Sequence, residues 1–158
     1  MYPGTMASFA VIIAAAGRSS RFADKNYKKP FAPLADRAVW LHSAERFMNR
    51  DDVKQTIVVI PAEDRELFDM KFGANVAILG LTVVEGGAER ADSVQKALEK
   101  VSADVDFVAI HDAARPCIAD VWIDWVFEAA ERSGAAILAA PVGETLKRVD
   151  GKIGRAHV

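Results

Sequence analysis

The sequence predicts an α/β fold in which a mostly parallel sheet carries helices on both faces. Short apolar runs alternate with longer amphipathic stretches along the 158 residues, a pattern typical of repeated strand–helix units. Most of the apolar runs are continuous rather than alternating, as in strands that are covered on both sides. The length suits one compact domain. We therefore expect residues 1–158 to form a single domain, with residues 1–8 as a disordered extension.

The individual elements follow from these runs in chain order. Strands are expected at 9–17, 56–61, 81–87, 107–112 and 135–142. Helices are expected at 39–49, 62–72, 89–101 and 120–133. A strand and a helix thus alternate along most of the chain, as a parallel sheet requires.

The expected helix at 120–133 has the clearest pattern. Its buried face is predicted to consist of Ile123, Val126, Phe127 and Ala130, which recur at helical spacing. The glycine at 134 is a natural helix end. Two tryptophans, at 122 and 125, lie partly off that face; we interpret them as packing residues, with a partner surface as the alternative.

Composition narrows the function classes. Apolar residues make up 51% of the chain and charged residues 27%, with a net charge of −2. A general nucleic-acid-binding domain would be strongly basic, so no nucleic-acid partner is expected. The single cysteine, Cys117, excludes an internal disulfide and fits a cytoplasmic protein. No apolar run reaches the length of a membrane span, so no membrane partner is expected.

A basic loop follows the first predicted strand. It reads AAAGRSSRFADKNYKKP over residues 14–30. The small residues up to Gly17 would let backbone amides approach a ligand closely, and Arg21 with Lys28 or Lys29 could supply charge to phosphate oxygens. The loop contains neither G-x-G-x-x-G nor G-K-[ST], which argues against an NAD-dependent oxidoreductase and a Walker loop. The alternative is an ordinary solvated loop.

A second loop, EGGAERADSV at 85–94, ends the third predicted strand. Its two glycines permit unusual backbone angles, and Arg90 and Ser93 share one face of the following helix. A helix N-terminus with free amides, an arginine and a hydroxyl suits a polar or anionic ligand. The alternative is a capped helix with a surface arginine.

The third loop, HDAARP at 111–116, follows the apolar run FVAI. Asp112 at the tip of a strand is well placed to hold a hard cation such as Mg²⁺, and Arg115 adds positive charge beside it. In the alternative, these two residues form a structural pair. We interpret His111 as a positioned side chain, because no second histidine or cysteine has metal-ligand spacing. Since ligands bind at the carboxyl ends of parallel strands, the three loops together favour a nucleotide-triphosphate reaction.

The motifs AAAGRSSRF, GGAERADSV, HDAARP and APVGETLKRV occur in this order, and the chain resembles the 2-C-methyl-D-erythritol 4-phosphate cytidylyltransferase family. The resemblance implies one Rossmann-like nucleotidyltransferase domain of the nucleotide-diphospho-sugar transferase type. It implies that CTP and methylerythritol phosphate are converted to CDP-methylerythritol and pyrophosphate with Mg²⁺, and that the intact protein is a homodimer. Family members continue past this point, so we expect the chain to lack the family's C-terminal part.

The resemblance also implies a role for each matching residue. The nucleotide pocket would be lined by Ala15, Ala16, Gly17, Gly87, Arg90 and Ser93. The catalytic charges on the triphosphate would come from Arg21 and Lys28, with a one-residue slip to Lys29 as the alternative. The metal would be held by Asp112. The acceptor would be bound by Ala113, Arg115 and Thr145.

Two other functions stay open at the level of sequence. One is a cytidylyltransferase for another polyol phosphate, such as ribitol 5-phosphate, which would have the same fold and metal. The other is an inactive nucleotide-binding fragment without the acceptor half.

Overall fold

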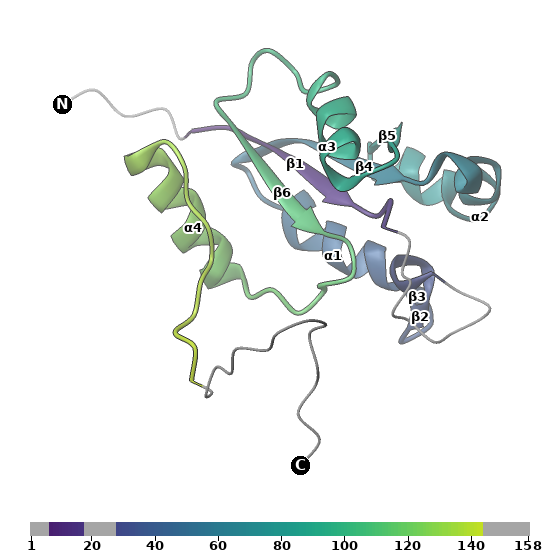
Figure 1. The fold of residues 1–158 in the computed structure, drawn as a ribbon, viewed down its shortest axis with the longest axis horizontal. Coiled ribbons are helices and arrows are strands. Elements are labelled where there is room, and N and C mark those ends of the chain that lie inside the picture. The colour runs from purple at the N-terminus through teal and green to yellow at the C-terminus, as the bar shows by residue number, and fades with distance from the viewer. Residues whose placement is uncertain (1–6, 18–27, 144–158) are drawn as a thin grey trace, which may run out of the picture.

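A computed structural model describes residues 7–17 and 28–143 of the chain. Its main sheet has four strands in the order β5-β4-β1-β6, and every neighbouring pair is parallel (Figure 1). The strands are β1 (Phe9–Ala14), β4 (Val53–Ile60), β5 (Thr82–Glu85) and β6 (Phe107–Asp112). The helices are α1 (Val39–Met48), α2 (Arg65–Ile78), α3 (Arg90–Leu98) and α4 (Asp120–Ser133). The predicted α/β class and parallel sheet are confirmed.

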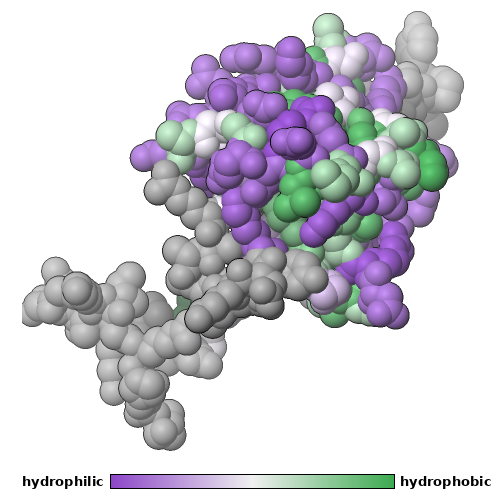
Figure 2. Space-filling model, turned by 90° about the vertical axis from the view of Figure 1, so that its right-hand side faces the viewer, coloured by the Kyte–Doolittle hydropathy of each residue, from purple (hydrophilic) through white to green (hydrophobic). Residues whose placement is uncertain are grey.

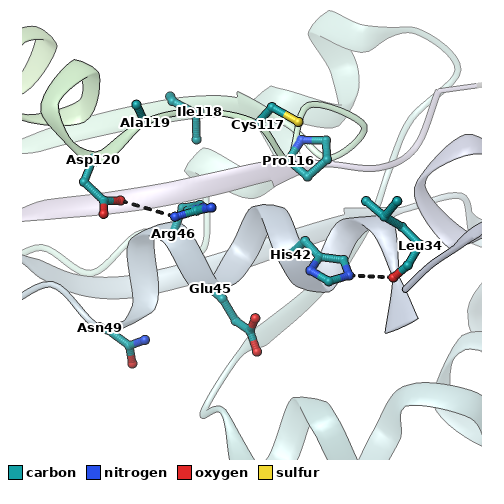
Figure 3. A pocket seen from close by; sticks show the side chains of 10 residues that line it. All are labelled: Leu34, His42, Glu45, Arg46, Asn49, Pro116, Cys117, Ile118, Ala119 and Asp120. Carbon is teal, nitrogen blue, oxygen red and sulfur yellow. Dashed lines mark hydrogen bonds and ion pairs between the residues drawn. The ribbon is translucent and has the colours of Figure 1, made fainter. Parts of the chain in front are cut away.

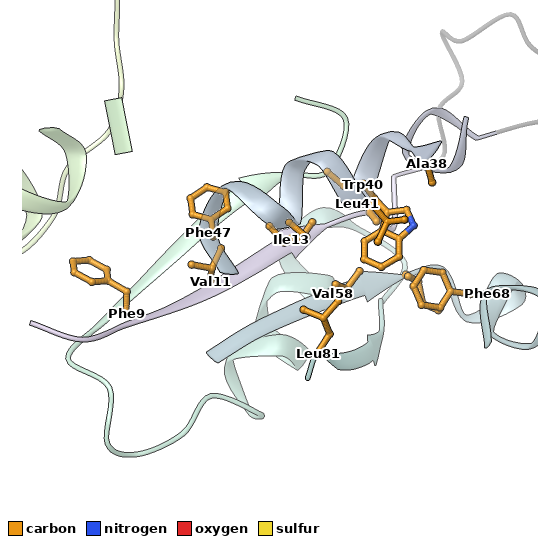
Figure 4. Close-up of a cluster of buried hydrophobic side chains, with 14 of the residues drawn as sticks. Phe9, Val11, Ile13, Ala38, Trp40, Leu41, Phe47, Val58, Phe68 and Leu81 are labelled. Atoms are coloured by element: carbon orange, nitrogen blue, oxygen red, sulfur yellow. The ribbon is translucent and has the colours of Figure 1, made fainter. Parts of the chain in front are cut away.

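The strands form because both sides of the central pair are covered. Along β1, Phe9, Val11 and Ile13 enter a core with residues of α1, α2 and α4, whereas Ile12 enters a separate cluster with Ala97 of α3. The larger cluster is drawn in Figure 4. Three helices therefore lie on one face and α3 on the other, which is why β1 reads as a continuous apolar run.

Edge strand β6 is covered on one face only. Phe107 and Ala109 pack against the larger core, while Val108 and Ile110 on the other face are exposed. α4 begins and ends as predicted, at Asp120 and Ser133. It stops there because Gly134 adopts a left-handed conformation with φ of 82°.

One predicted strand is wrong. Residues 135–142 form no strand, and Ile137 and Val142 are largely exposed. Within the described part of the chain, β6 pairs only with β1, and no strand lies against its other edge. An apolar run forms a strand only where a neighbouring strand pairs with its backbone N–H and C=O groups. Within the described residues, segment 135–142 has no such partner strand.

The expected N-terminal extension includes two residues, 7 and 8, that the structure describes, whereas residues 1–6 lie outside the described residues. Ser8 is buried, and its N–H and hydroxyl both donate to Oδ2 of Asp106 at 2.8 Å. Ala7 packs against the larger core. These contacts tie residues 7 and 8 to the segment before β6, so they belong to the domain.

Two short turns and a small ribbon complete the fold. A 3₁₀ turn η1 (Lys29–Phe31) precedes the strands β2 (Pro33–Leu34) and β3 (Arg37–Ala38), and a second turn η2 (Ala62–Asp64) precedes α2. Strands β2 and β3 are antiparallel. The face of the molecule seen in Figure 2 is mostly hydrophilic, with apolar side chains in small patches. No helix in the described ranges has the length and apolar character needed to cross a bilayer.

Candidate functional site

A cavity of about 640 Å³ lies at the carboxyl ends of the central strands. Ala14, Val59 and Asp112, which end or nearly end β1, β4 and β6, are neighbours in the sheet register and all line it. The chain leaves β1 towards β4 on one side, and returns to β6 on the other side only after β5. This change of direction makes the position between β1 and β6 the switch point at which open α/β sheets bind ligands.

The end of β1 provides a close backbone surface. Ala15 is fully buried, and its N–H donates to the Val59 carbonyl at 2.8 Å. Ala16 and Gly17 line the cavity instead. Of the three residues predicted here, two face the cavity and Ala15 supports them from the core.

The loop after β5 packs directly against the end of β1. The N–H of Gly86 donates to the Ile60 carbonyl at 2.8 Å, and a Cβ at Gly86 would lie 2.7 Å from both Ala16 Cβ and Ser93 Oγ. A Cβ at Gly87 would lie 2.3 Å from Asp92 Cβ. These two glycines are therefore required by close packing, which brings the second loop to the cavity beside the first.

Ser93 holds this loop from below. The side chain is buried, and its Oγ accepts from the Gly87 N–H at 3.0 Å and donates to the Glu89 carbonyl at 2.9 Å. Nζ of Lys96 donates to the Gly86 carbonyl at 3.1 Å. A capping box between Glu89 and Asp92 starts α3. Ser93 lines the cavity, but both functions of its hydroxyl are used within the protein.

Asp112 is held between two arginines. Its Oδ1 lies 2.7 Å from Nη1 of Arg90, and its Oδ2 lies 2.9 Å from Nε of Arg115. Burial alone would raise the pKa of Asp112, but the hydrogen bond from Arg115 and the positive charges of both arginines outweigh it and hold the pKa below its ordinary value. The carboxylate therefore stays ionised and joins the second and third loops.

The two residues that flank Asp112 in the chain are turned away from it. Ala113 is fully buried; its N–H donates to the Ala14 carbonyl at 3.1 Å, and its carbonyl accepts from Ser43 Oγ at 2.8 Å. His111 lies against Phe47, and its Nε2 donates to the Arg115 carbonyl at 3.0 Å. Burial lowers the pKa of His111, against the opposing effect of that hydrogen bond. Ala113 thus has no exposed group that could make the predicted contact with a substrate. His111 is a positioned side chain, as predicted.

The two candidate lysines point to different places. Nζ of Lys28 lies 2.6 Å from Oδ2 of Asp64 and 3.0 Å from Oε1 of Glu63, whereas Lys29 lines the cavity. The geometry therefore favours Lys29, the alternative that the sequence left open, as the lysine that faces a ligand. The other catalytic candidate, Arg21, and the acceptor candidate Thr145 lie outside the described residues.

Two carboxylate residues, Glu89 and Asp112, line the cavity, and the Glu89 side chain is already used in the capping box of α3. Among residues 7–17 and 28–143, no three His, Cys, Asp or Glu side chains are grouped to hold a metal. Mg²⁺ commonly uses one or two protein carboxylates together with substrate phosphates and waters. Asp112 at the cavity therefore fits Mg²⁺ that arrives with phosphates, but not a metal held by protein groups alone.

Sequence reasoning missed the residues that support the site. Ser43 and Lys96 reach the backbone of the third and second loops, and Ala114 lines the cavity. Ser43 lies on α1, far from the loops in sequence, and no local pattern marks it. Lys96 lies two turns into α3, where a lysine ordinarily extends into solvent.

A larger cavity, of about 770 Å³, lies between α1 and the connection from β6 to α4 (Figure 3). Arg46 and Asp120 face each other across it at 3.8 Å, and His42 Nε2 bonds the Leu34 carbonyl at 2.8 Å. Arg46 is the one lysine or arginine among the described residues that line it, and none of Ala14, Val59 and Asp112 lines it. Three such cations, Lys29, Arg90 and Arg115, line the smaller cavity. Position and converging cations, not size, therefore identify the smaller cavity as the candidate site.

A family of known proteins matches nearly the whole chain. The family described as 2-C-methyl-D-erythritol 4-phosphate cytidylyltransferase matches residues 9–156. A protein of that name from Rhodopirellula baltica is 40% identical over 156 residues, which cover 92% of this chain and 64% of the relative. The bifunctional enzyme IspD/IspF of Rhodospirillum rubrum is 40% identical over 153 residues, which cover 95% of this chain and 39% of that protein.

Solved structures show the same fold. A crystal structure of 4-diphosphocytidyl-2C-methyl-D-erythritol synthase aligns with a TM-score of 0.71 and 26% identity, over 91% of this chain and 64% of that one. The bifunctional IspDF of Campylobacter jejuni aligns with a TM-score of 0.65 and 28% identity, over 80% of this chain and 31% of that one. The chain thus spans less than two thirds of the length of these relatives. Since the family model matches residues 9–156 and a relative of that name is 40% identical over 92% of this chain, the chain belongs to the 2-C-methyl-D-erythritol 4-phosphate cytidylyltransferase family.

Proposed function

We propose that this domain binds CTP and transfers its cytidylyl group to 2-C-methyl-D-erythritol 4-phosphate. The observation that carries the proposal is the convergence of two close backbone loops with Lys29, Arg90, Asp112 and Arg115 at the switch point of the sheet. Such a site suits a ligand with several phosphates, because cationic side chains and closely approaching amides neutralise phosphate oxygens.

In the proposed reaction, a phosphate oxygen of methylerythritol phosphate attacks the α-phosphorus of CTP. A new oxygen–phosphorus bond forms, and the bond from the α-phosphorus to the oxygen that bridges to the β-phosphorus breaks. The electron pair leaves with pyrophosphate. The nucleophile is already an anion, so the protein needs no strong general base and acts by positioning and charge neutralisation.

Each described group has a place in this scheme. Ala16 and Gly17 let the backbone approach the nucleotide, with Ala15 behind them. Arg90 and the loop that Gly87 and Ser93 hold would contact the cytidine part.

The charges divide between the two substrates. Lys29, together with Arg21, would neutralise the triphosphate. Arg115, with Thr145, would bind the acceptor phosphate, while Ala113 supports that loop from the core. Asp112 would hold Mg²⁺, which would supply positive charge to the α-phosphate oxygens when it is bound.

The arginine pairs of Asp112 give the proposal a further feature. Each carboxylate oxygen carries one ion pair, with Arg90 or Arg115, so a cation at Asp112 would be repelled by two guanidinium charges unless substrate phosphates compete for them. Phosphates that arrive together with the cation would bind the guanidinium groups and bring the cation to Asp112 in the same step. This supports joint binding of nucleotide and metal.

Pyrophosphate release tests the proposal. The chain is incubated with CTP, Mg²⁺ and methylerythritol phosphate, and parallel reactions contain ribitol 5-phosphate or replace CTP with UTP or ATP. We expect release with CTP and methylerythritol phosphate, and its loss in Arg115→Gln. Turnover with ribitol 5-phosphate alone would contradict the proposed acceptor. Calorimetric binding of CTP without any turnover would show a nucleotide-binding domain that is not an enzyme by itself.

A homodimer, which the family resemblance implies, and a cytoplasmic location, which the single cysteine favours, accompany this proposal as expectations. Sedimentation velocity over a range of protein concentrations measures the first. Fractionation of cells that express the protein measures the second.

A further inference from the structure

Lys28 and Lys29 are neighbours in the chain but serve different surroundings. Lys29 lines the cavity. The Lys28 side chain turns to the start of α2, where its Nζ lies 2.6 Å from Asp64 Oδ2 and 3.0 Å from Glu63 Oε1. Lys28 is not among the residues that line the cavity.

The turn between them is held at several points. The carbonyl of Lys28 accepts from the N–H groups of Phe31 and Ala32, at 2.9 and 3.1 Å. Pro30 is buried. The ring of Phe31 lies 5.9 Å from that of Phe68 on α2, between centroids. Lys28 and Phe31 thus fasten both ends of the turn to η2 and α2.

The ion pair with Asp64 is the stronger of the two contacts. The Asp64 side chain is 19% exposed and that of Lys28 31%, whereas Glu63 is 71% exposed. Ion pairs shielded from water are weakened less by salt and hydration than exposed ones. Partial burial opposes the charge on Lys28, but the hydrogen bonds and charges of Asp64 and Glu63 outweigh it and raise its pKa. Lys28 is therefore a firmly charged anchor.

We propose that Lys28 is a positioning residue: its ion pair with Asp64 fixes the turn that presents Lys29 to the triphosphate. The proposal rests on the proposed function, since it needs a nucleotide in the cavity. It differs from a direct role for Lys28, in which the side chain would have to leave Asp64 to reach a phosphate.

A double-mutant cycle separates the two roles. If Lys28 positions the turn, Lys28→Met and Asp64→Asn each raise the KM and the Kd for CTP by a similar factor, about three- to tenfold, and the double variant is no worse than either. The exchanged pair Lys28→Asp with Asp64→Lys restores much of the affinity. If Lys28 contacts phosphate directly, Asp64→Asn frees it and leaves the affinity equal or higher, and the exchanged pair restores nothing. That result would overturn the proposal.

The kinetic constants are expected to divide as well. Loss of positioning raises the KM for CTP more than it lowers kcat. Lys29→Met lowers kcat itself, because it removes the positive charge that would lie beside the reacting phosphates. Lys71→Met is the matched control, since it removes an exposed lysine from α2 and is expected to change neither constant.

Hydrogen exchange of the turn gives a readout without any nucleotide. The amides of Phe31 and Ala32, which bond to the Lys28 carbonyl, should exchange several-fold faster in Lys28→Met and in Asp64→Asn, but not in Lys29→Met or Lys71→Met. Unchanged exchange would overturn the positioning role even if CTP does not bind. Failure of the unsubstituted chain to bind CTP, with faster exchange in these variants, would instead overturn the proposed function.

Discussion

Arg90, the first residue of α3, and Asp112, the last residue of β6, form an ion pair of 2.7 Å between Nη1 and Oδ1. The pair joins the loop proposed to hold the nucleotide to the loop proposed to hold the acceptor. Since Arg115 occupies the other carboxylate oxygen, Asp112 has contacts to both halves of the site. A change at this one side chain should therefore affect metal, nucleotide and acceptor together.

Asp112→Asn is expected to lower Mg²⁺-dependent turnover by about 10²–10³-fold, the scale seen when one electrostatic stabiliser is removed. The amide keeps the shape of the side chain but loses the charge that would hold the cation. Pyrophosphate release measured against Mg²⁺ concentration checks this. Asp69→Asn, at an exposed ion pair on α2, is the control and should retain full activity. Normal turnover in Asp112→Asn would remove Asp112 from the proposed metal site.

Gly86→Ala is expected to destabilise the protein and to weaken CTP binding. The added Cβ would lie 2.7 Å from Ala16 Cβ and from Ser93 Oγ, so the two loops would have to separate. Overpacking of this kind costs about 1–3 kcal/mol of unfolding free energy. Urea unfolding and CTP calorimetry measure the two effects.

The same substitution at Gly73 should have the opposite sign. Gly73 lies inside α2, and a Cβ there meets no atom within 4 Å. Alanine in an open helix interior stabilises by about 0.5–1 kcal/mol relative to glycine. Equal changes in unfolding free energy for Gly86→Ala and Gly73→Ala would show that close packing does not require a glycine at position 86.

The alternation of strands and helices along the chain could be predicted because the local apolar patterns agree with what a parallel sheet requires. β1 is a continuous apolar run and is covered on both sides. Segment 135–142 is similarly apolar but forms no strand, since the property that decides it, a partner strand, is not local. The ribbon β2–β3 was missed because its turn places Ala35 and Asp36 at positive φ, 47° and 63°, without the Asn-Gly signature of such turns.

The location of the site could be predicted, but not the work of each side chain. Parallel strands bring their carboxyl ends to one edge, so three loops far apart in the chain meet. Which of two residues adjacent in the chain faces the cavity depends on the conformation of the local turn. The sequence could not separate Lys28 from Lys29, nor show that both hydroxyl functions of Ser93 serve its own loop.

Phe127→Ala is expected to cost about 3–5 kcal/mol of unfolding free energy. The ring is 4% exposed and stacks on Phe9 of β1 with centroids 3.7 Å apart, so the substitution leaves a cavity between α4 and the sheet. Trp125→Ala, on the same helix but 59% exposed, should cost about 0.5 kcal/mol or less. Chemical denaturation of both variants measures the difference. A similar large loss at Trp125 would point to a buried contact that this surface makes with another chain.

His111 should give the domain a component of stability that depends on pH. Burial lowers its pKa in the folded state, whereas the unfolded chain titrates near the ordinary value of about 6.5. Because the unfolded state binds the proton more readily, stability is complete above about pH 6.5 and falls as the pH drops from there through the folded pKa. His111→Gln can still donate to the Arg115 carbonyl but does not titrate, so its unfolding free energy should change less between about pH 6.5 and pH 5 than that of the unsubstituted protein. Urea unfolding at half-unit pH intervals measures both curves, and parallel curves would show that His111 carries its proton equally well in the folded and unfolded states.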